Sequence, residues 1–199
     1  MAAIGVILLA AGGSSRLGRP KQLLPWGTTT LLHRAAMTAV ETGLAPVIVV
    51  LGAESERCRR EVESLPVKIA VNESWREGMG SSLRVGVETL EEALPEADGA
   101  LVMLNDQPRI AAATLQRLVE LWQWSRKAAA AGFYGDRVGV PAVFGRALFA
   151  ELKALPGAEG AKGILERYAE DLAKMEMPEA LDDIDSAEDY RRVLAEVSR

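Results

Sequence analysis

The sequence contains few of the residues on which several common kinds of chemistry depend. One cysteine, Cys58, stands among 199 residues, and a single thiol closes neither an internal disulfide nor a thiolate zinc site. The one histidine, His33, falls in a stretch that predicts a helix, which gives a Ser-His-Asp triad little support. The scarcity of cysteine fits a reducing compartment, and we expect a cytoplasmic protein.

Long apolar runs and a positive net charge are also absent. No run reaches the roughly 18 apolar residues that a membrane helix needs. The apolar start at residues 2–11 has no Lys or Arg before it, which argues against a signal peptide. The formal net charge is -5, and a negative field opposes nucleic acid binding. We therefore expect small-molecule substrates, with no membrane and no nucleic acid as partners.

What the sequence does contain is a regular alternation of strand and helix signals. Its length suits one large domain, residues 1–199, and 49% of the residues are hydrophobic. Continuous aliphatic runs predict parallel strands that are buried on both faces, and amphipathic stretches predict the helices between them. The strands are expected at residues 4–9, 46–51, 67–71 and 100–104, with a further apolar strand around Met175 and Met177. Helices are expected at 28–43, 54–64, 83–94 after the Gly/Ser stretch 78–82, after Ala111, and at 146–155, 161–172 and 187–197.

This order predicts an α/β fold of three layers: a Rossmann-like, mostly parallel sheet with helices on both faces. The stretch 133–144 contains glycines and a proline, and we expect irregular or antiparallel strands there. Ligands of such sheets bind beyond the carboxyl ends of the strands. The candidate sites are therefore the polar segments that follow apolar runs, at residues 10–21, 105–108 and 183–186.

The segment after the first predicted strand combines small residues with cations. Glycines and small side chains let backbone N–H groups approach oxygen atoms closely. Arg16 can fork onto a phosphate, and Lys21 can act as a mobile point charge. The segment is predicted to bind phosphate, although each cation taken singly also suits a solvated surface loop. The expected nucleotide-binding residues are Leu9, Ala10, Ala11, Gly12, Gly13, Ser14, Arg16 and Lys21.

Two familiar phosphate-binding loops do not fit this segment. A dinucleotide fingerprint G-x-G-x-x-G that begins at Gly12 fails because Ser14 stands where its second glycine belongs. A Walker A loop that places its glycines at Gly13 and Gly18 fails because Arg19 and Pro20 replace its lysine and hydroxyl. Neither of these two motifs therefore describes the loop.

Two acidic segments are candidate metal sites. Asp106 follows the apolar run at 100–104, and Mg²⁺ is commonly held by one or two carboxylates together with substrate phosphates. The alternative role for Asp106 is to organise a turn before Pro108. Asp185 lies in the second segment, at residues 182–190. There Asp185 or Ser186 could instead cap the helix that follows.

A third candidate segment, residues 75–83, places glycines and hydroxyls at a predicted helix start. Unpaired N–H groups and the helix dipole attract anions at such a position. Plain capping by Ser81 or Ser82 is the alternative. The candidate binding residues here are Gly80, Ser81 and Ser82.

Taken together, these segments carry a resemblance to a known family. Residues 9–21 resemble the signature L-A-A-G-x-S-x-R-x-G-x-x-K of nucleotidyltransferases that make nucleoside diphosphate conjugates. The continuation Pro-Lys-Gln-Leu-Leu at residues 20–24 is most similar to the molybdenum cofactor cytidylyltransferase branch. Residues 105–108 and 183–190 resemble that family's Asp-Gln-Pro and D-I-D-T-P-E-D-Y elements, and residues 78–83 resemble its G-M-G-x-S-L element.

The resemblance implies roles for the candidate residues. Arg16 would contact the departing pyrophosphate and Lys21 would stabilise charge at the attacked phosphorus, so that Arg16, Lys21 and Asp106 are the expected catalytic residues. Asp106 and Asp185 would hold Mg²⁺. The implied reaction transfers CMP from CTP to molybdopterin carrying molybdenum and releases pyrophosphate, with transient contact to a molybdoenzyme as a further implied partner.

Two positions bear on the substrates. Ala158 stands where the resembling segment L-x-G-D-x-G-A-R has its Asp, so one contact to the acceptor is expected to be missing. With Ala at position 11, the segment Leu9–Gly12 resembles the cytidylyl branch, whereas guanylyl relatives usually have Gly at this position. Two alternatives stay open: transfer from CTP or GTP to another phosphorylated metabolite, and a non-catalytic chaperone that carries the cofactor to molybdoenzymes.

Overall fold

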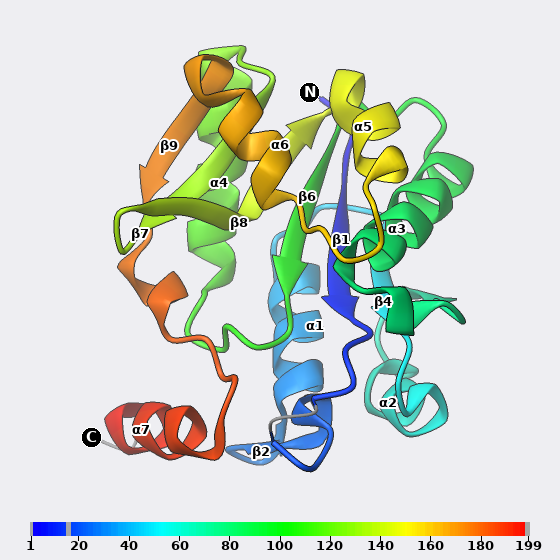
Figure 1. Ribbon diagram of the computed structural model, residues 1–199, viewed down its shortest axis with the longest axis vertical. Helices are drawn as coiled ribbons and strands as arrows, with labels where there is room; N and C mark the ends of the chain where they lie inside the picture. The colour runs from blue at the N-terminus through cyan, green and yellow to red at the C-terminus, as the bar shows by residue number, and fades with distance from the viewer. Residues whose placement is uncertain (1, 15–16, 198–199) are drawn as a thin grey trace.

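The structure is a computed structural model that describes residues 2–14 and 17–197. Its centre is a seven-stranded sheet in the order β5-β4-β1-β6-β8-β7-β9 (Figure 1). Pairing is parallel throughout β5, β4, β1 and β6, and β8 is antiparallel to both of its neighbours. The strands are β1 Ile4–Ala10, β4 Val47–Leu51, β5 Lys68–Val71, β6 Gly99–Leu104, β7 Ala129–Tyr134, β8 Arg137–Gly145 and β9 Leu172–Glu176, and a separate ribbon pairs β2 Pro25–Trp26 with β3 Thr29–Thr30.

Helices cover both faces of the sheet, which confirms the predicted three layers. All seven residues of β1 are buried, and alternate side chains along a strand point to opposite faces. Leu8 therefore packs into the core beneath α1, α2 and α4, whereas Ile7 packs into the core beneath α3, α5 and α6. The helices are α1 Leu31–Glu41, α2 Ser55–Val62, α3 Met79–Ala93, α4 Ala112–Ser125, α5 Phe149–Ala154, α6 Lys162–Arg167 and α7 Ala187–Val197.

Local signals account for two predicted features. The helix expected from residue 28 begins at Leu31, because Thr30 caps it by accepting the backbone N–H of His33 at 3.3 Å. The antiparallel strands expected in 133–144 are the hairpin of β7 and β8. Its two turn residues, Gly135 and Asp136, both have positive φ, as a hairpin turn that matches the strand twist requires.

One predicted helix is wrong in its second half. The sequence favours a helix over 161–172, but α6 ends at Arg167, and a short 3-10 turn, Ala169–Asp171, leads into β9. Leu172 and Ala173 instead pair with β7 and are buried. Strand pairing with a long-range partner thus overrides the local helical pattern.

The fold brings distant segments to one edge of the sheet. The arrowheads of β1 and β6 point to the same edge, where the loop after β1 and α7 also lie (Figure 1). There Leu24 and Leu31 pack against Ile184 and Val193 from the C-terminal segment in a small apolar cluster. Among the residues that the structure describes, no helix has both the length and the apolar character needed to cross a membrane.

Candidate active site

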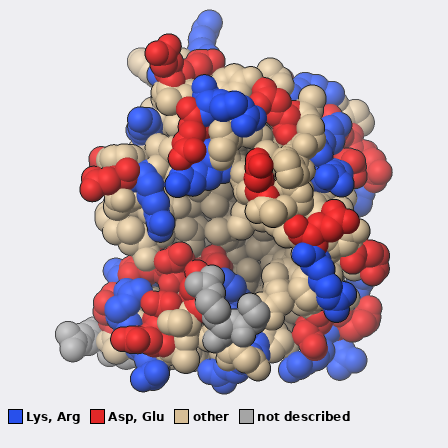
Figure 2. Space-filling view, viewed as in Figure 1, with Lys and Arg blue, Asp and Glu red and all other residues tan. Residues whose placement is uncertain are grey.

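A cavity of about 560 Å³ opens at the carboxyl ends of β1 and β6. Figure 2 shows this face of the molecule hollowed near its centre, with uncharged side chains in the hollow and charged side chains around it. The wall combines the glycine-rich loop, the start of α3 and the end of β6. It is formed by Leu9, Ala11, Gly12, Gly13, Lys21, Gln22, Trp75, Arg76, Gly78, Met79, Ser82, Leu104, Asn105 and Asp106.

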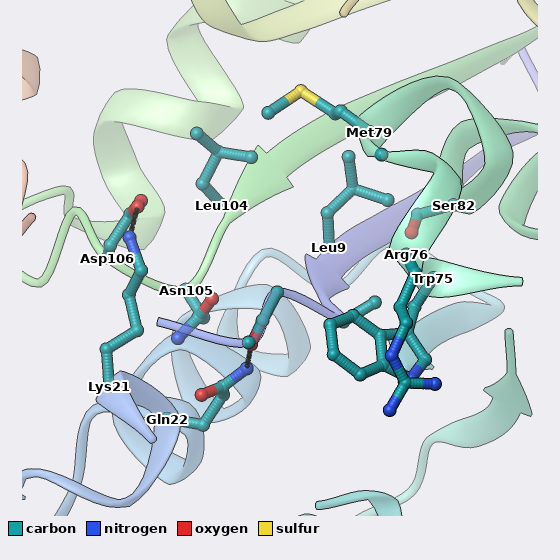
Figure 3. A pocket seen from close by; sticks show the side chains of 14 residues that line it. Leu9, Lys21, Gln22, Trp75, Arg76, Met79, Ser82, Leu104, Asn105 and Asp106 are labelled. Atoms are coloured by element: carbon teal, nitrogen blue, oxygen red, sulfur yellow. Dashed lines mark hydrogen bonds and ion pairs between the residues drawn. The ribbon is translucent and has the colours of Figure 1, made fainter. Parts of the chain in front are cut away.

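Lys21 joins two carboxylates, and one of them, Asp106, lies beside it at one side of this cavity (Figure 3). Its Nζ donates hydrogen bonds to Asp106 Oδ2 at 2.6 Å and to Asp185 Oδ1 at 2.9 Å. It also donates to the carbonyl oxygen of Ile184 at 3.3 Å. The sequence separations are 85 and 164 residues for the two carboxylates, so only the fold brings these charges together.

The charges of this cluster are partly shielded from water. The side chains of Lys21 and Asp106 are 15% and 13% exposed, whereas that of Asp185 is 38% exposed. Burial by itself lowers the pKa of Lys21, but the charges of Asp106 and Asp185 and their hydrogen bonds outweigh it, so that the pKa is raised above its usual value. Lys21 is therefore an ammonium at any physiological pH.

Asp106 has one oxygen to spare for a ligand. Its Oδ2 accepts the hydrogen bond from Lys21, whereas its Oδ1 is buried and has no hydrogen-bond partner among the described residues. The same holds for the amide nitrogen Nδ2 of the neighbouring Asn105. Buried polar atoms are nearly always paired, so these two atoms at the cavity wall are open to water or to a ligand.

The two carboxylates fit a hard divalent cation. Mg²⁺ prefers oxygen ligands and commonly keeps several from water or phosphates, and Asp106 and Asp185 both reach the position of one cation, the Lys21 ammonium. Within residues 2–14 and 17–197, no group of three or more acidic, histidine or cysteine side chains could hold a metal by itself. Two carboxylates of this chain would therefore need oxygens from water or from a substrate to complete a site.

A third carboxylate, Asp183, lies close enough to the cluster to be affected by the charges of Asp106 and Asp185. The sequence did not single out Asp183 as a site residue. Burial, followed by the charges of Asp106 and Asp185, raises the pKa of Asp183 above its usual value. The D-I-D pattern contained the signal, since alternate residues of an extended segment share a side.

The C-terminal segment is held against β6 by hydrogen bonds and ion pairs. The backbone N–H of Ile184 donates to the carbonyl oxygen of Asp106 at 3.0 Å. Arg109, in the loop after β6, pairs with Asp182 at 2.7 Å, and Arg192 of α7 pairs with the same carboxylate at 2.9 Å within the C-terminal segment itself. These contacts fix the position of the residues around 185 relative to the end of β6.

The sequence leaves helix capping and metal binding open as roles for the segment 182–190, and in the structure the cap and the candidate metal ligand are different residues. Ser186 caps α7, because its Oγ accepts the backbone N–H of Asp189 at 3.1 Å. The carboxylate of Asp189 in turn accepts the backbone N–H of Ser186 at 2.9 Å, which is the reciprocal pattern of a capping box. Asp185, one residue earlier, pairs with Lys21.

Gln22 anchors the glycine-rich loop, a function that sequence reasoning missed. Its buried side-chain amide Nε2 donates to the carbonyl oxygens of Ala10 at 2.9 Å and Gly12 at 2.7 Å. The backbone N–H of Lys21 donates to Ser14 Oγ at 2.9 Å. The two ends of the loop are thereby tied together, so Ser14 serves the loop's own conformation in this structure. Arg16, the remaining predicted loop residue, lies outside the described residues.

Trp75 and Arg76 form the side of the cavity opposite Lys21 (Figure 3). The Arg76 guanidinium lies 4.4 Å from the centre of the Trp75 ring, within the range of a cation–π contact. A Cβ atom on Gly13 would come within 2.8 Å of the same ring. Gly13 is thus required for the close approach of Trp75, which is a packing reason in addition to its predicted role at a phosphate.

The start of α3 makes more internal contacts than the sequence indicates. The Gly80 N–H donates to the carbonyl oxygen of Gly157 at 2.9 Å. The Ser81 hydroxyl donates to the carbonyl oxygen of Gly78 at 2.8 Å and accepts from Asn72 Nδ2. Ser82 also accepts from Asn72, and it alone of the three predicted residues Gly80, Ser81 and Ser82 lines the cavity. Binding roles for Gly80 and Ser81 stay predictions, and both have structural roles.

We expect Gly80→Ala to lower the free energy of unfolding by about 1–3 kcal/mol, the usual cost of forcing an extra methyl into a packed site. The added Cβ would lie 2.2 Å from the carbonyl oxygen of Pro156, a backbone atom that cannot turn away. Gly12→Ala is the matched control, since nothing lies within 4 Å of its added Cβ. Urea unfolding of both variants measures the difference, and equal stabilities would contradict this packing role.

The fold and the site define an α/β protein with a glycine-rich loop after its central strand, β1, and a lysine–carboxylate cluster beside that loop. The model of the MobA-like NTP transferase domain matches residues 6–172. The chain therefore belongs to the MobA-like NTP transferase family, and the predicted nucleotidyltransferase class is confirmed at that level. The narrower cytidylyltransferase branch stays a prediction.

Individual relatives align along most of the chain. Nicotine blue oxidoreductase of Paenarthrobacter nicotinovorans is 34% identical over 197 residues, which cover 94% of this chain and 95% of that protein. Purine catabolism protein PucB of Bacillus subtilis is 31% identical over 199 residues, with 94% of each chain covered. The crystal structure of Rv0371c from Mycobacterium tuberculosis superposes with a TM-score of 0.83 at 33% identity, with 98% of each chain covered. A structure of the same protein in complex with manganese superposes with a TM-score of 0.78, at 31% identity and 98% coverage of each chain.

Proposed function

We propose that this protein transfers CMP from CTP to the terminal phosphate of molybdopterin carrying molybdenum and releases pyrophosphate, with Mg²⁺ as the divalent cation. The observation that carries the proposal is the meeting of Lys21 with Asp106 and Asp185 beside a cavity walled by the glycine-rich loop. Both reactants are anions, so the barrier lies largely in aligning phosphates and neutralising charge. A cation and two potential metal ligands at one point suit that task.

Each residue of the cluster has a defined part in this reaction. Lys21 balances charge at the attacked phosphorus, and Arg16 favours the departing pyrophosphate. Asp106 and Asp185 would hold the divalent cation, which when bound neutralises charge on triphosphate oxygens. Gly12 leaves room for the triphosphate beside the backbone. The acceptor phosphate is already ionised near neutral pH, so no histidine base is required.

The choice of acceptor and nucleotide rests on further features. Leu9, Trp75 and Leu104 give the cavity an apolar wall, which suits a flat heteroaromatic ring such as a pterin. Ala11 is the residue of the cytidylyl branch. The manganese complex of the Rv0371c protein supports a divalent cation, and Mg²⁺ is the form we propose here. Delivery of the product would involve brief contact with the recipient molybdoenzyme.

A panel of nucleotides and acceptors tests the proposal. The purified protein is incubated with each of the four ribonucleoside triphosphates, Mg²⁺, and either molybdenum-loaded molybdopterin or sugar phosphates, and pyrophosphate release is measured. We expect release with CTP and the loaded pterin. Pyrophosphate release with sugar phosphates alone or with GTP alone would favour nucleotidyl transfer to another phosphorylated metabolite or from GTP. Tight binding of the pterin without pyrophosphate release would favour a non-catalytic chaperone that carries the cofactor.

One relative justifies a further arm of this experiment. Nicotine blue oxidoreductase is named for a redox reaction, so the same preparation is tested for oxidation of NADH and NADPH. We expect none, because Ser14 breaks the dinucleotide fingerprint. Oxidation of either cofactor without pyrophosphate release would overturn the transferase proposal.

A further inference from the structure

The Lys21 ammonium stands between the two carboxylates that are proposed to hold the metal. Its contact at 2.6 Å with Asp106 is short, and the one at 2.9 Å with Asp185 is of ordinary length for a hydrogen bond between an ammonium and a carboxylate. All three side chains are at least partly withdrawn from water, so their mutual attraction is screened less than at an open surface. In this structure the Lys21 ammonium thus bridges the two carboxylates.

A divalent cation that bridges Asp106 Oδ2 and Asp185 Oδ1 would take the position that the Lys21 ammonium now holds, even though Asp106 Oδ1 is open to a further ligand. Mg²⁺ binds oxygen ligands at about 2.0–2.1 Å, and two cations so close together repel each other strongly in a partly buried site. Only one of them fits at the bridging position. Removing the Lys21 ammonium without a replacement would in turn take away the charge that bridges two partly buried carboxylates, which is costly.

The local structure lets the side chain of Lys21 move while its backbone stays fixed. The backbone N–H is held by Ser14 Oγ, and Gln22, the next residue, is tied to Ala10 and Gly12. A lysine ends in a flexible four-carbon stem with a compact charge. From this fixed point in the glycine-rich loop, the ammonium can exchange the carboxylates for phosphate oxygens in the adjoining cavity.

We propose that Lys21 acts as a latch on the metal site: it occupies the cation position in the nucleotide-free protein and yields it when a triphosphate arrives to bind the ammonium. This inference rests on the proposed function and concerns the regulation of the same site. Metal binding and triphosphate binding are then coupled through one side chain. Because such coupling is reciprocal, each ligand raises the affinity for the other, and free metal alone binds weakly.

The test measures Mn²⁺ binding to the nucleotide-free protein by electron paramagnetic resonance. We expect Lys21→Met to bind Mn²⁺ at least about tenfold more tightly than the wild type, a change within the range of measured coupling between sites. Lys153→Met is the matched control. It removes the same charge from a pair with Glu91 at 2.6 Å, and neither residue lines the cavity. An affinity of Lys21→Met equal to or weaker than that of the wild type would overturn the latch.

A second measurement keeps the test decisive if Lys21→Met is unstable. Under the latch, Mn²⁺ replaces the missing charge, so it should raise the melting temperature of Lys21→Met far more than that of the wild type or of Lys153→Met. Equal shifts in all three proteins would contradict the latch. Pyrophosphate release by the wild type is measured separately. If the wild type turns over but Lys21→Met shows neither tighter Mn²⁺ binding nor a larger melting-temperature shift, only the latch is refuted. If Lys21→Met shows both effects of Mn²⁺ but the wild type releases no pyrophosphate with any acceptor, only the proposed function is refuted.

Discussion

Replacing Asp106 by Asn is expected to reduce turnover about a thousandfold and to leave the fold intact. The carboxylate would lose its charge and one cation-binding oxygen, and stabilisation of phosphate charge by a metal is worth several kcal/mol, or about three powers of ten in rate. The fold should survive because Asn has the same shape, the backbone bond between Asp106 and Ile184 is unchanged, and Lys21 still has Asp185 as a partner.

Pyrophosphate release across a magnesium titration measures this effect, with circular dichroism as the check on folding. Asp136→Asn is the matched control, because Asp136 is exposed in the β7–β8 turn and Asn is equally tolerated at its positive φ. The control should retain wild-type turnover. Wild-type turnover of Asp106→Asn at every magnesium concentration would show that the metal assignment is wrong.

Replacing Lys21 by Ala is expected to lower kcat by about 10²–10³-fold, the usual effect of removing one charge-stabilising group from the transition state. Nucleotide affinity should fall less, because the negative charge at the phosphorus centre is redistributed chiefly in the transition state. Steady-state kinetics with CTP and the loaded pterin separate kcat from KM. Lys153→Ala supplies the control for loss of one positive charge.

The Lys21 prediction also links catalysis to the latch. Removal of this lysine should weaken catalysis and strengthen metal binding in the same protein, because the ammonium is proposed to leave the carboxylates and serve the phosphates. A general loss of folding would lower both quantities. A variant that loses affinity for CTP in proportion to kcat/KM, with kcat unchanged, would show that Lys21 contributes binding only.

The fold could be predicted because its strongest signals are local. Strands such as β1 and β4 are covered on both faces, so their sequences are continuous aliphatic runs, and the hairpin turn at Gly135 needs residues that tolerate positive φ. The edge strand β9 was harder to place. Leu172 lies at the end of a helical pattern, and its pairing with β7 depends on residues that are far away in the sequence.

The site could be predicted only in part, for a related reason. Residue types and the rule that ligands bind at strand ends indicated Lys21 and the two acidic segments, and the resemblance to the nucleotidyltransferase family singled out Asp106 and Asp185 within them. Their pairing in one cluster depends on the packing of the C-terminal segment against β6, which no local pattern encodes. The carbonyl oxygens that Gln22 binds likewise become visible only in three dimensions.

The glycines at the start of α3 show why a motif can have two explanations. Gly78 and Gly80 suit an anion-binding helix start, but both also lie against the segment 156–158, where a Cβ on either would come within 2.4 Å of a backbone oxygen. Either requirement alone selects glycine at these positions. The sequence therefore cannot tell close packing from ligand binding there, whereas Ser82 lines the cavity itself.

The central claim is that one triphosphate is held jointly by the loop after β1 and by a divalent cation on Asp106 and Asp185. Crystals grown with Mn²⁺ and a non-hydrolysable CTP analogue, measured at the manganese absorption edge, test it most directly. We predict an anomalous peak between the two carboxylates, the triphosphate along residues 11–21, and the Lys21 ammonium on a phosphate oxygen. A triphosphate bound away from both the loop and the carboxylates would contradict the account.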